Sequence, residues 1–102
     1  YLNIVGGMKI DETAADLAVA LSLVSGVMDK PIDEQTMVFG EIGLSGEIRS
    51  VSRANARVNE AARLGFTKCI LPKACIKQIT DCHTSITLIG VSNLRQAIDA
   101  VK

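Results

Sequence analysis

Aromatic side chains are almost absent from this sequence. Of its 102 residues 48% are hydrophobic but only 3% are aromatic, and there is no tryptophan. A core made without aromatic residues must be built from Val, Ile, Leu and Ala, a composition that suits a sheet packed against helices. The three aromatic residues, Tyr1, Phe39 and Phe66, lie in apolar segments and are predicted to be core. Binding of single-stranded DNA by base stacking is therefore not expected.

Signals for disulfides and metal sites are also missing. The three cysteines, Cys69, Cys75 and Cys82, are odd in number and form no CxxC pair, and the single histidine is His83. Structural zinc sites need closer ligand pairs, so we predict free thiols and no metal site. Free thiols are typical of proteins of the reducing cytoplasm, which is the location that we expect.

The sequence has no net charge and no long hydrophobic run. Eleven basic residues balance eleven acidic ones, so binding to nucleic acid would have to come from a local patch. The longest apolar-rich stretch, residues 14–28, contains Asp16 and is shorter than the roughly 20 residues that span a membrane. We predict a soluble protein in which this stretch forms a central helix, covered on most sides.

Hydrophobic periodicity, glycines and prolines predict an α/β (α+β) fold. The expected elements are a strand over 1–5; a helix over 13–28, capped by Asp11 or Thr13; two short strands within 37–51, joined by a turn at Leu44–Gly46; a helix over 53–64, ended by Gly65; a strand over 68–71; a short helix over 73–79; a strand over 85–89; and a final helix, capped by Ser92 and ending at Val101. This order defines a fold class and says nothing of activity.

Three segments in register resemble the Lon protease family. They are Asp11-Glu-Thr-Ala-Ala-Asp-Leu-Ala18, then Phe39-Gly-Glu-Ile-Gly-Leu-Ser-Gly-Glu-Ile-Arg49, and Asn59-Glu-Ala-Ala-Arg-Leu-Gly-Phe66 running into Ile70-Leu-Pro-Lys73. The second resembles the TGEITLRGRV hairpin of Lon. The resemblance implies a fold of the Lon proteolytic-domain type, similar to the second domain of ribosomal protein S5. Residues 1–102 are expected to form this one domain, without its usual N-terminal hairpin.

Within that family, the sequence of these segments is most similar to the C-terminal domain of the RadA/Sms family of DNA repair proteins. Val5-Gly-Gly and Val38-Phe-Gly-Glu-Ile-Gly-Leu-Ser-Gly-Glu-Ile-Arg49 carry this resemblance. It implies a parent protein with a zinc finger and a DNA-dependent ATPase region, in which ATP, Mg and Zn are expected. It also implies a homo-oligomer, a hexameric ring, that acts on single-stranded or branched DNA. The sequence itself contains no GxxxxGK[ST] motif, so we expect no cofactor in this part.

The resemblance also locates the Ser-Lys dyad of Lon, and both of its members are replaced. The serine of the DGPSAG motif falls on Ala14, and the lysine of the following helix falls on Asn55. A methyl group is no nucleophile and an amide is no general base, so we predict that the domain is not an enzyme. The alternatives are a Lon-like serine peptidase, if the register is wrong, and a module that binds peptides without cutting them.

Two roles remain, assembly with further copies and contact with DNA. Arg49, Arg53 and Arg57 recur at four-residue intervals and predict a basic stripe that binds phosphates without recognising sequence. Lysines 68, 73 and 77 suggest a second basic cluster. The opposing interpretation of both sets is a solvated surface, in which the arginines pair with carboxylates such as Glu41 and Glu47.

Overall fold

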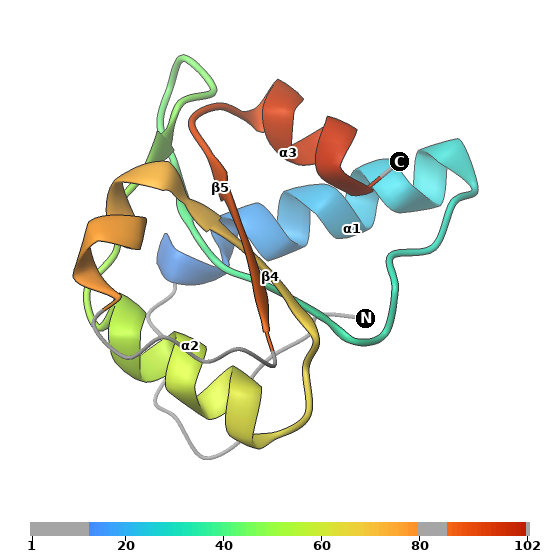
Figure 1. Cartoon of the computed structure of the whole chain (residues 1–102). Helices are drawn as coiled ribbons and strands as arrows, with labels where there is room; N and C mark the ends of the chain where they lie inside the picture. Colours follow the sequence, from blue (N-terminus) through green and yellow to red (C-terminus); the bar gives the residue numbers. More distant parts are fainter. Residues whose placement is uncertain (1–12, 80–85, 102) are drawn as a thin grey trace.

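A three-stranded parallel sheet lies at the centre of the structure, a computed structural model that describes residues 13–79 and 86–101 (Figure 1). Its strands are β1 (Thr36–Val38), β4 (Lys68–Pro72) and β5 (Thr87–Val91), in the order β1-β4-β5. Cys69 of β4 is in register with Met37 and Leu88 of the two outer strands. The predicted α/β class is therefore confirmed, while the strand predicted over 1–5 lies outside the described residues.

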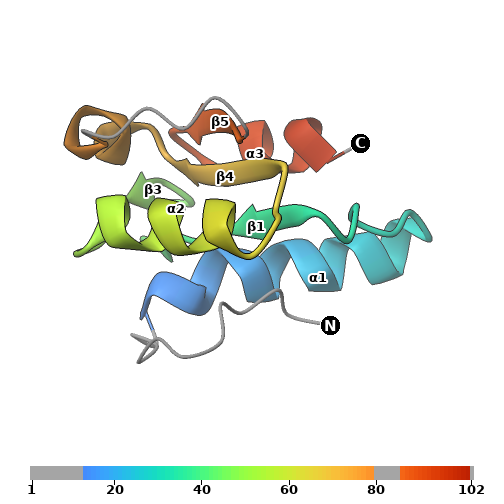
Figure 2. The ribbon, with the colours of Figure 1, turned by 60° about the horizontal axis from the view of Figure 1, so that its bottom comes forward.

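Helices cover both faces of this sheet. Alternate residues of a strand point to opposite faces, and Met37, Phe39 and Cys69 pack with α2 (Ala54–Arg63). Val38 and Ile70 pack on the other face, against α1 (Asp16–Met28) and α3 (Leu94–Val101). Figure 2 shows α1 running along β1. The two clusters consist mainly of aliphatic residues, as the composition predicts, and Phe39 and two cysteines lie among them.

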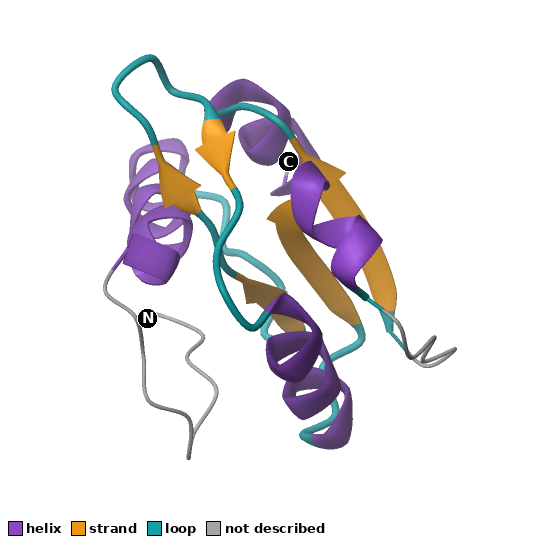
Figure 3. Ribbon diagram, turned by 90° about the vertical axis from the view of Figure 1, so that its left-hand side faces the viewer, coloured by secondary structure: helices purple, strands orange, loops and turns teal. Residues whose placement is uncertain are grey.

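A separate hairpin follows β1. Its strands are β2 (Glu41–Ile42) and β3 (Ile48–Arg49), which pair antiparallel and stand apart from the main sheet (Figure 3). Gly46 has a φ of 82°, a left-handed conformation that favours glycine in a tight turn. The predicted hairpin is confirmed. The prediction of one strand before the turn is incomplete. The chain forms two strands there, separated by Gly40: β1 belongs to the parallel sheet and β2 to the hairpin.

The second predicted helix is confirmed to within a residue at each end. Gly65 follows the C-cap Leu64 with a φ of 94°. Its N–H donates to the Ala62 carbonyl (3.2 Å), and the Phe66 N–H donates to the Ala61 carbonyl (3.0 Å). These two bonds form a Schellman motif, which satisfies carbonyls that the helix end leaves open. Gly65 thus ends the helix as predicted.

Two of the predicted N-terminal caps, Thr13 and Ser92, are wrong. Thr13 lies in a short 3-10 turn, η1 (Thr13–Ala15), and the residue at the N-cap of α1 is Ala15, whose side chain makes no capping bond. Asp11 lies outside the described residues. At the last helix the cap is Asn93, whose Oδ1 accepts the Gln96 N–H at 2.8 Å. Gln96 in turn accepts the N–H of Ser92 (2.7 Å), the residue that the sequence suggested as the cap.

The prediction for α1 as a central helix, covered on most sides, is also wrong. Only Leu17, Ala18 and Leu21 are buried, whereas Leu23 and Val27 are 67% and 88% exposed. The sheet and α3 occupy one side of the helix, and in the described part of the chain no helix or strand covers the other. None of the helices in residues 13–79 and 86–101 is long and apolar enough to cross a membrane.

The remaining elements are close to their predictions. The strand β4 ends at Pro72 and leads into a 3-10 helix, η2 (Lys73–Gln78), where a short helix is predicted. The last strand, β5, begins at Thr87 and ends at Val91, two residues later than predicted. These differences of one or two residues are of the size expected at the ends of helices and strands.

Gly40 joins the start of α1 to the sheet and the hairpin. Its N–H donates to the Ala14 carbonyl (2.8 Å), and its carbonyl accepts the Leu17 N–H (3.0 Å). A Cβ at this position would lie 3.1 Å from Ile48, 3.2 Å from Leu17 and 3.3 Å from Pro72. These neighbours belong to three different elements, so they cannot all yield at once.

We therefore expect Gly40→Ala to lower the free energy of unfolding by about 1–2 kcal/mol, the range of overpacked core positions. The matched control is Gly26→Ala in α1, where a new Cβ would meet no atom within 4 Å. That change should raise the free energy of unfolding by about 0.5–1 kcal/mol, since alanine is the better helix former. Urea denaturation measures both. Equal effects at the two positions would contradict the packing argument.

Candidate functional site

Ala14 and Asn55, the residues that the Lon resemblance aligns with its dyad, lie near the same part of the core. Ala14 lies in η1 and is 2% exposed, and its methyl group belongs to the cluster that also contains Ala54, the residue before Asn55. Asn55 lies in the first turn of α2 and is half-buried. The structure thus brings together the two segments that the resemblance pairs. Neither Ala14 nor Asn55 offers a group that can attack a carbonyl.

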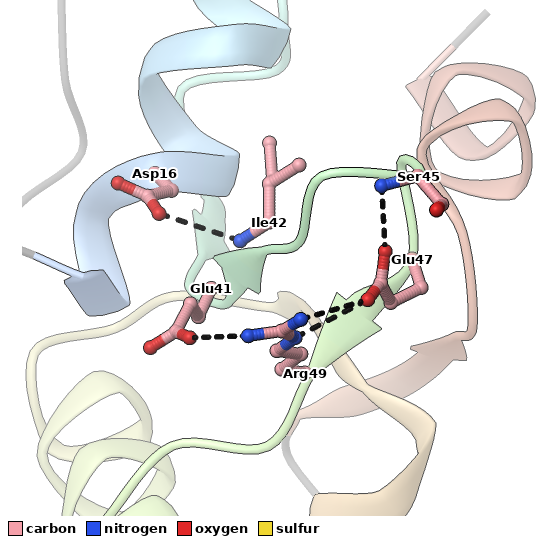
Figure 4. Close-up of polar contacts among 6 residues, drawn as sticks. All are labelled: Asp16, Glu41, Ile42, Ser45, Glu47 and Arg49. Carbon is pink, nitrogen blue, oxygen red and sulfur yellow. Dashed lines mark hydrogen bonds and ion pairs between the residues drawn. The ribbon is translucent and has the colours of Figure 1, made fainter.

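A polar network connects the start of α1 to the hairpin (Figure 4). Asp16 Oδ2 accepts the N–H of Ile42 at 3.4 Å. Arg49 lies between two carboxylates, with Nη2 at 3.1 Å from Glu47 and Nη1 at 3.7 Å from Glu41. The charge of Arg49 is therefore balanced locally, as the solvated-surface interpretation of the arginines expects.

Glu47 also holds the turn of the hairpin in shape. Its Oε1 accepts the Ser45 N–H at 3.0 Å, and its Oε2 accepts Arg49 Nε at 3.2 Å. A hydrogen bond to its own backbone, then those from Arg49 and Ser45, hold the pKa of the Glu47 carboxyl below its usual value. Glu47 is thus a carboxylate at neutral pH, fixed at the base of the turn.

The predicted stripe of three arginines does not form one exposed surface. Arg57 is 6% exposed, its Nε donates to the Ser52 carbonyl at 3.0 Å, and its guanidinium lies 5.9 Å from the centre of the Phe39 ring. Arg53 is exposed and is the N-cap of α2, with a φ of 62°. The expectation that Arg53 and Arg57 share a helical face is wrong: one lies in the core and the other at the surface.

The structure instead places η2, which carries two of the predicted lysines, beside the segment that leads into Arg53. The Cys75 thiol of η2 donates to the Val51 carbonyl (3.8 Å), which places η2 beside the residues that lead into α2. Lys73 and Lys77 of η2 are both exposed. We call Arg49, Arg53, Lys73 and Lys77 the basic surface. This grouping was not visible in the sequence, because it depends on how η2 packs.

Lys68 does not belong to this surface. It begins β4, whereas Lys73 follows the end of that strand. At about 3.3 Å per residue the strand separates the two by roughly 13 Å or more. The predicted cluster of three lysines is therefore divided: Lys68 begins β4, and only the last two lie on η2.

The described cysteines are core residues. Cys69 and Cys75 are both fully buried free thiols, and burial, followed by the nearby Cys75, raises the pKa of Cys69 to about 12. Such a thiol is protonated at neutral pH and is a poor nucleophile and metal ligand. In residues 13–79 and 86–101 no group of three or more His, Cys, Asp or Glu could hold a metal ion. Cys82 lies outside the described residues.

One cavity near the end of α1 was not predicted. It has a volume of about 250 Å³, below the roughly 300–1,000 Å³ of pockets that hold drug-sized ligands. Its lining residues are Ala18, Ser22, Ser25, Pro31, Ile32, Glu34 and Val38. They come from α1, the following loop and β1, and no spacing in the sequence marks them as a group.

Comparison with known proteins gives the class of this α/β domain. Residues 3–75 match the family model described as ChlI, Subunit ChlI of Mg-chelatase, and the chain belongs to that family. Among its relatives, the DNA repair protein RadA of Streptococcus pyogenes serotype M1 is 48% identical over 101 residues. That match covers 99% of this chain and 22% of the relative.

Two further relatives carry the same name. The DNA repair protein RadA of Streptococcus pneumoniae strain R6 is 46% identical over 99% of this chain and 24% of its own length. The DNA repair protein RadA of Escherichia coli K12 is 41% identical, and the match covers 96% of this chain and 21% of the relative. The predicted resemblance to RadA is confirmed, and the chain spans about a fifth to a quarter of the length of these relatives.

Proposed function

We propose that this chain is the Lon-like, non-catalytic domain of a RadA-type DNA repair and recombination protein, with roles in assembly and in contact with DNA. The similarity to RadA over almost the whole chain supports the proposal that the parent protein is of the RadA type. The parallel sheet with helices on both faces and a following hairpin is compatible with a Lon-type, S5-like fold. The parent is proposed to be a cytoplasmic ATPase that carries ATP, Mg and Zn in its other regions.

The observation that carries the non-catalytic part of the proposal is the environment of Ala14. Its methyl group is buried in the core cluster at the position of the Lon nucleophile, and Asn55 stands where the base is expected. No rotation of either side chain supplies a nucleophile or a base. The domain then keeps the scaffold of a peptidase without its chemistry.

The DNA contact is proposed for the basic surface. Arg53, Lys73 and Lys77 are exposed, and Arg49 joins them with its charge partly balanced by Glu41 and Glu47. Such a cluster binds phosphate oxygens through charge and recognises no base. Arg57 is left out of this contact because its guanidinium is engaged with Ser52 and Phe39.

We expect a labelled single-stranded DNA to bind the chain at low salt, with an affinity that falls steeply as salt is added. The double variant Arg53→Ala, Lys77→Ala should raise the Kd about tenfold and lower the salt slope by about 1.4, since two phosphate contacts are lost. Fluorescence anisotropy at several salt concentrations measures both quantities. A branched DNA, tested in parallel, shows which form is preferred.

The matched control is Lys30→Ala, which removes one exposed charge beyond the far end of α1. Its Kd should change less than twofold. Absence of binding at low salt, or equal loss in control and double variant, would rule out the basic surface as the contact. The same preparation is incubated with an unfolded protein. Cleavage would overturn the non-catalytic proposal, and binding without cleavage would favour a peptide-binding module.

A further inference from the structure

A second cavity lies where two strands of the parallel sheet begin. Thr36 and Lys68, the first residues of β1 and β4, are in register with each other, and both line this cavity. The loop before β1 and the end of α3 form its other walls. The volume is about 210 Å³, below the roughly 300–1,000 Å³ of pockets for drug-sized molecules. Any ligand of this cavity is therefore small.

Two side chains of opposite charge line the cavity without pairing with each other. Asp33 is exposed and Lys68 is half-buried, and no ion pair within residues 13–79 and 86–101 joins the two. Gln35 anchors both of them: its N–H donates to Asp33 Oδ1 (2.9 Å), and its carbonyl accepts the backbone N–H of Lys68 (3.3 Å). The loop thus holds an anion and the strand a cation at one small cavity, where a single ligand can contact both.

The rest of the wall is largely aliphatic. Ile32, Ile70, Ala100 and Val101 line the cavity, and the first, third and fourth of these pack against the core cluster that contains Ile70. An apolar group bound there leaves water, which favours binding. A phosphate would face the carboxylate of Asp33, and a metal ion would face the ammonium of Lys68. The lining therefore favours a ligand that carries both charges and an apolar part.

We propose that this cavity binds a small zwitterion, a free amino acid with an aliphatic side chain. Lys68 binds its carboxylate, Asp33 binds its ammonium group, and the aliphatic wall receives its side chain. Such a ligand matches both charges of the cavity, whereas neither end of a peptide carries both. The site is separate from the proposed DNA contact, because Lys68 lies outside the basic surface.

The test is a titration of the nitrogen-15-labelled chain with L-leucine, followed by NMR. The amide signals of Ile32, Lys68 and Ala100 should shift, with a Kd of roughly 1 mM, as expected for a ligand of so few atoms. Leucinamide lacks the carboxylate and isocaproate lacks the ammonium group. Each should bind about tenfold more weakly than leucine, because each leaves one charge of the cavity without a partner.

Two variants assign the charges. Lys68→Met should raise the Kd of leucine about tenfold without weakening leucinamide, which has no carboxylate to lose. Asp33→Asn should likewise weaken leucine but not isocaproate. Lys30→Met and Glu34→Gln serve as controls, since they remove exposed charges of the same loop that do not line this cavity. The Kd of leucine should change less than twofold in both.

Several results would overturn the proposal. One is equal affinity for leucine and its two analogues, and another is leucine binding that Lys68→Met leaves unchanged. Shifts confined to the other cavity, at Ser22 and Ser25, would do the same, as would no shift at any concentration that leucine reaches in solution. Urea denaturation without ligand gives a further outcome. A marked loss of stability in Lys68→Met would show that Lys68 is paired within its own chain and is not available to a ligand.

Discussion

Arg57→Ala is expected to lower the free energy of unfolding by about 3 kcal/mol. The variant removes the part-buried hydrogen bond from the Arg57 guanidinium to the Ser52 carbonyl, and hydrogen bonds of charged groups contribute roughly 1.5–3 kcal/mol. It also removes the cation from the face of Phe39 and leaves a cavity where the buried stem packed. Chemical denaturation followed by circular dichroism measures the change.

Two variants separate the causes. Arg57→Met keeps most of the apolar volume and should recover about half of the loss, because only the polar contacts are then missing. Arg53→Ala removes the neighbouring exposed arginine and should change the free energy of unfolding by less than about 0.5 kcal/mol. If Arg57→Ala left stability unchanged and abolished DNA binding, Arg57 would be a DNA contact after all. This pair of measurements therefore has to precede any scan of the arginines for DNA binding.

The free energy of unfolding should also fall in alkaline solution because of Cys69. In the unfolded chain the thiol ionises near its usual pKa of 9.0, whereas in the fold its pKa is raised to about 12. Between these values the unfolded state binds fewer protons than the folded one, so stability falls as the pH rises. At about 1.4 kcal/mol per pH unit, the loss from this thiol between pH 8 and 10.5 is about 2 kcal/mol.

Cys69→Val isolates this effect from the lysines and the tyrosine. Valine is apolar, similar in size and does not titrate, so the variant should lose about 2 kcal/mol less than the unaltered chain between the two pH values. Urea denaturation of both proteins at pH 8 and pH 10.5 gives the comparison. Parallel losses in the two proteins would show that Cys69 does not ionise differently in the folded and unfolded states.

Local sequence signals predicted the elements of the fold well. Gly46 and Gly65 mark a turn and a helix end because each adopts a backbone conformation that other residues avoid. The strand over 68–71 and the helix over 53–64 follow from hydrophobic spacing in the same way. These signals depend only on neighbours along the chain.

What the sequence could not predict depends on packing between distant segments. The apolar composition of α1 indicated a helix covered on most sides, but composition does not show how many elements are present to cover it. Spacing alone placed Arg57 beside Arg53, yet the burial of Arg57 depends on Phe39, which lies in the loop after β1. The element η2, which carries Lys77, lies beside the segment before Arg53 only through its packing. The sequence therefore predicted basic residues for the candidate site but not which of them group together.

The connection of the hairpin to the start of α3 also bears on the order in which the chain folds. The Gly46 carbonyl accepts the Leu94 N–H and the Ser92 carbonyl accepts the Ile48 N–H, although these pairs lie nearly half the chain apart. During synthesis the hairpin leaves the ribosome long before its partners exist. Until residues 92–94 emerge, the turn that carries Leu44 has no support from the start of α3. The hairpin therefore gains this support only after residues 92–94 have been synthesised, well after its own two strands.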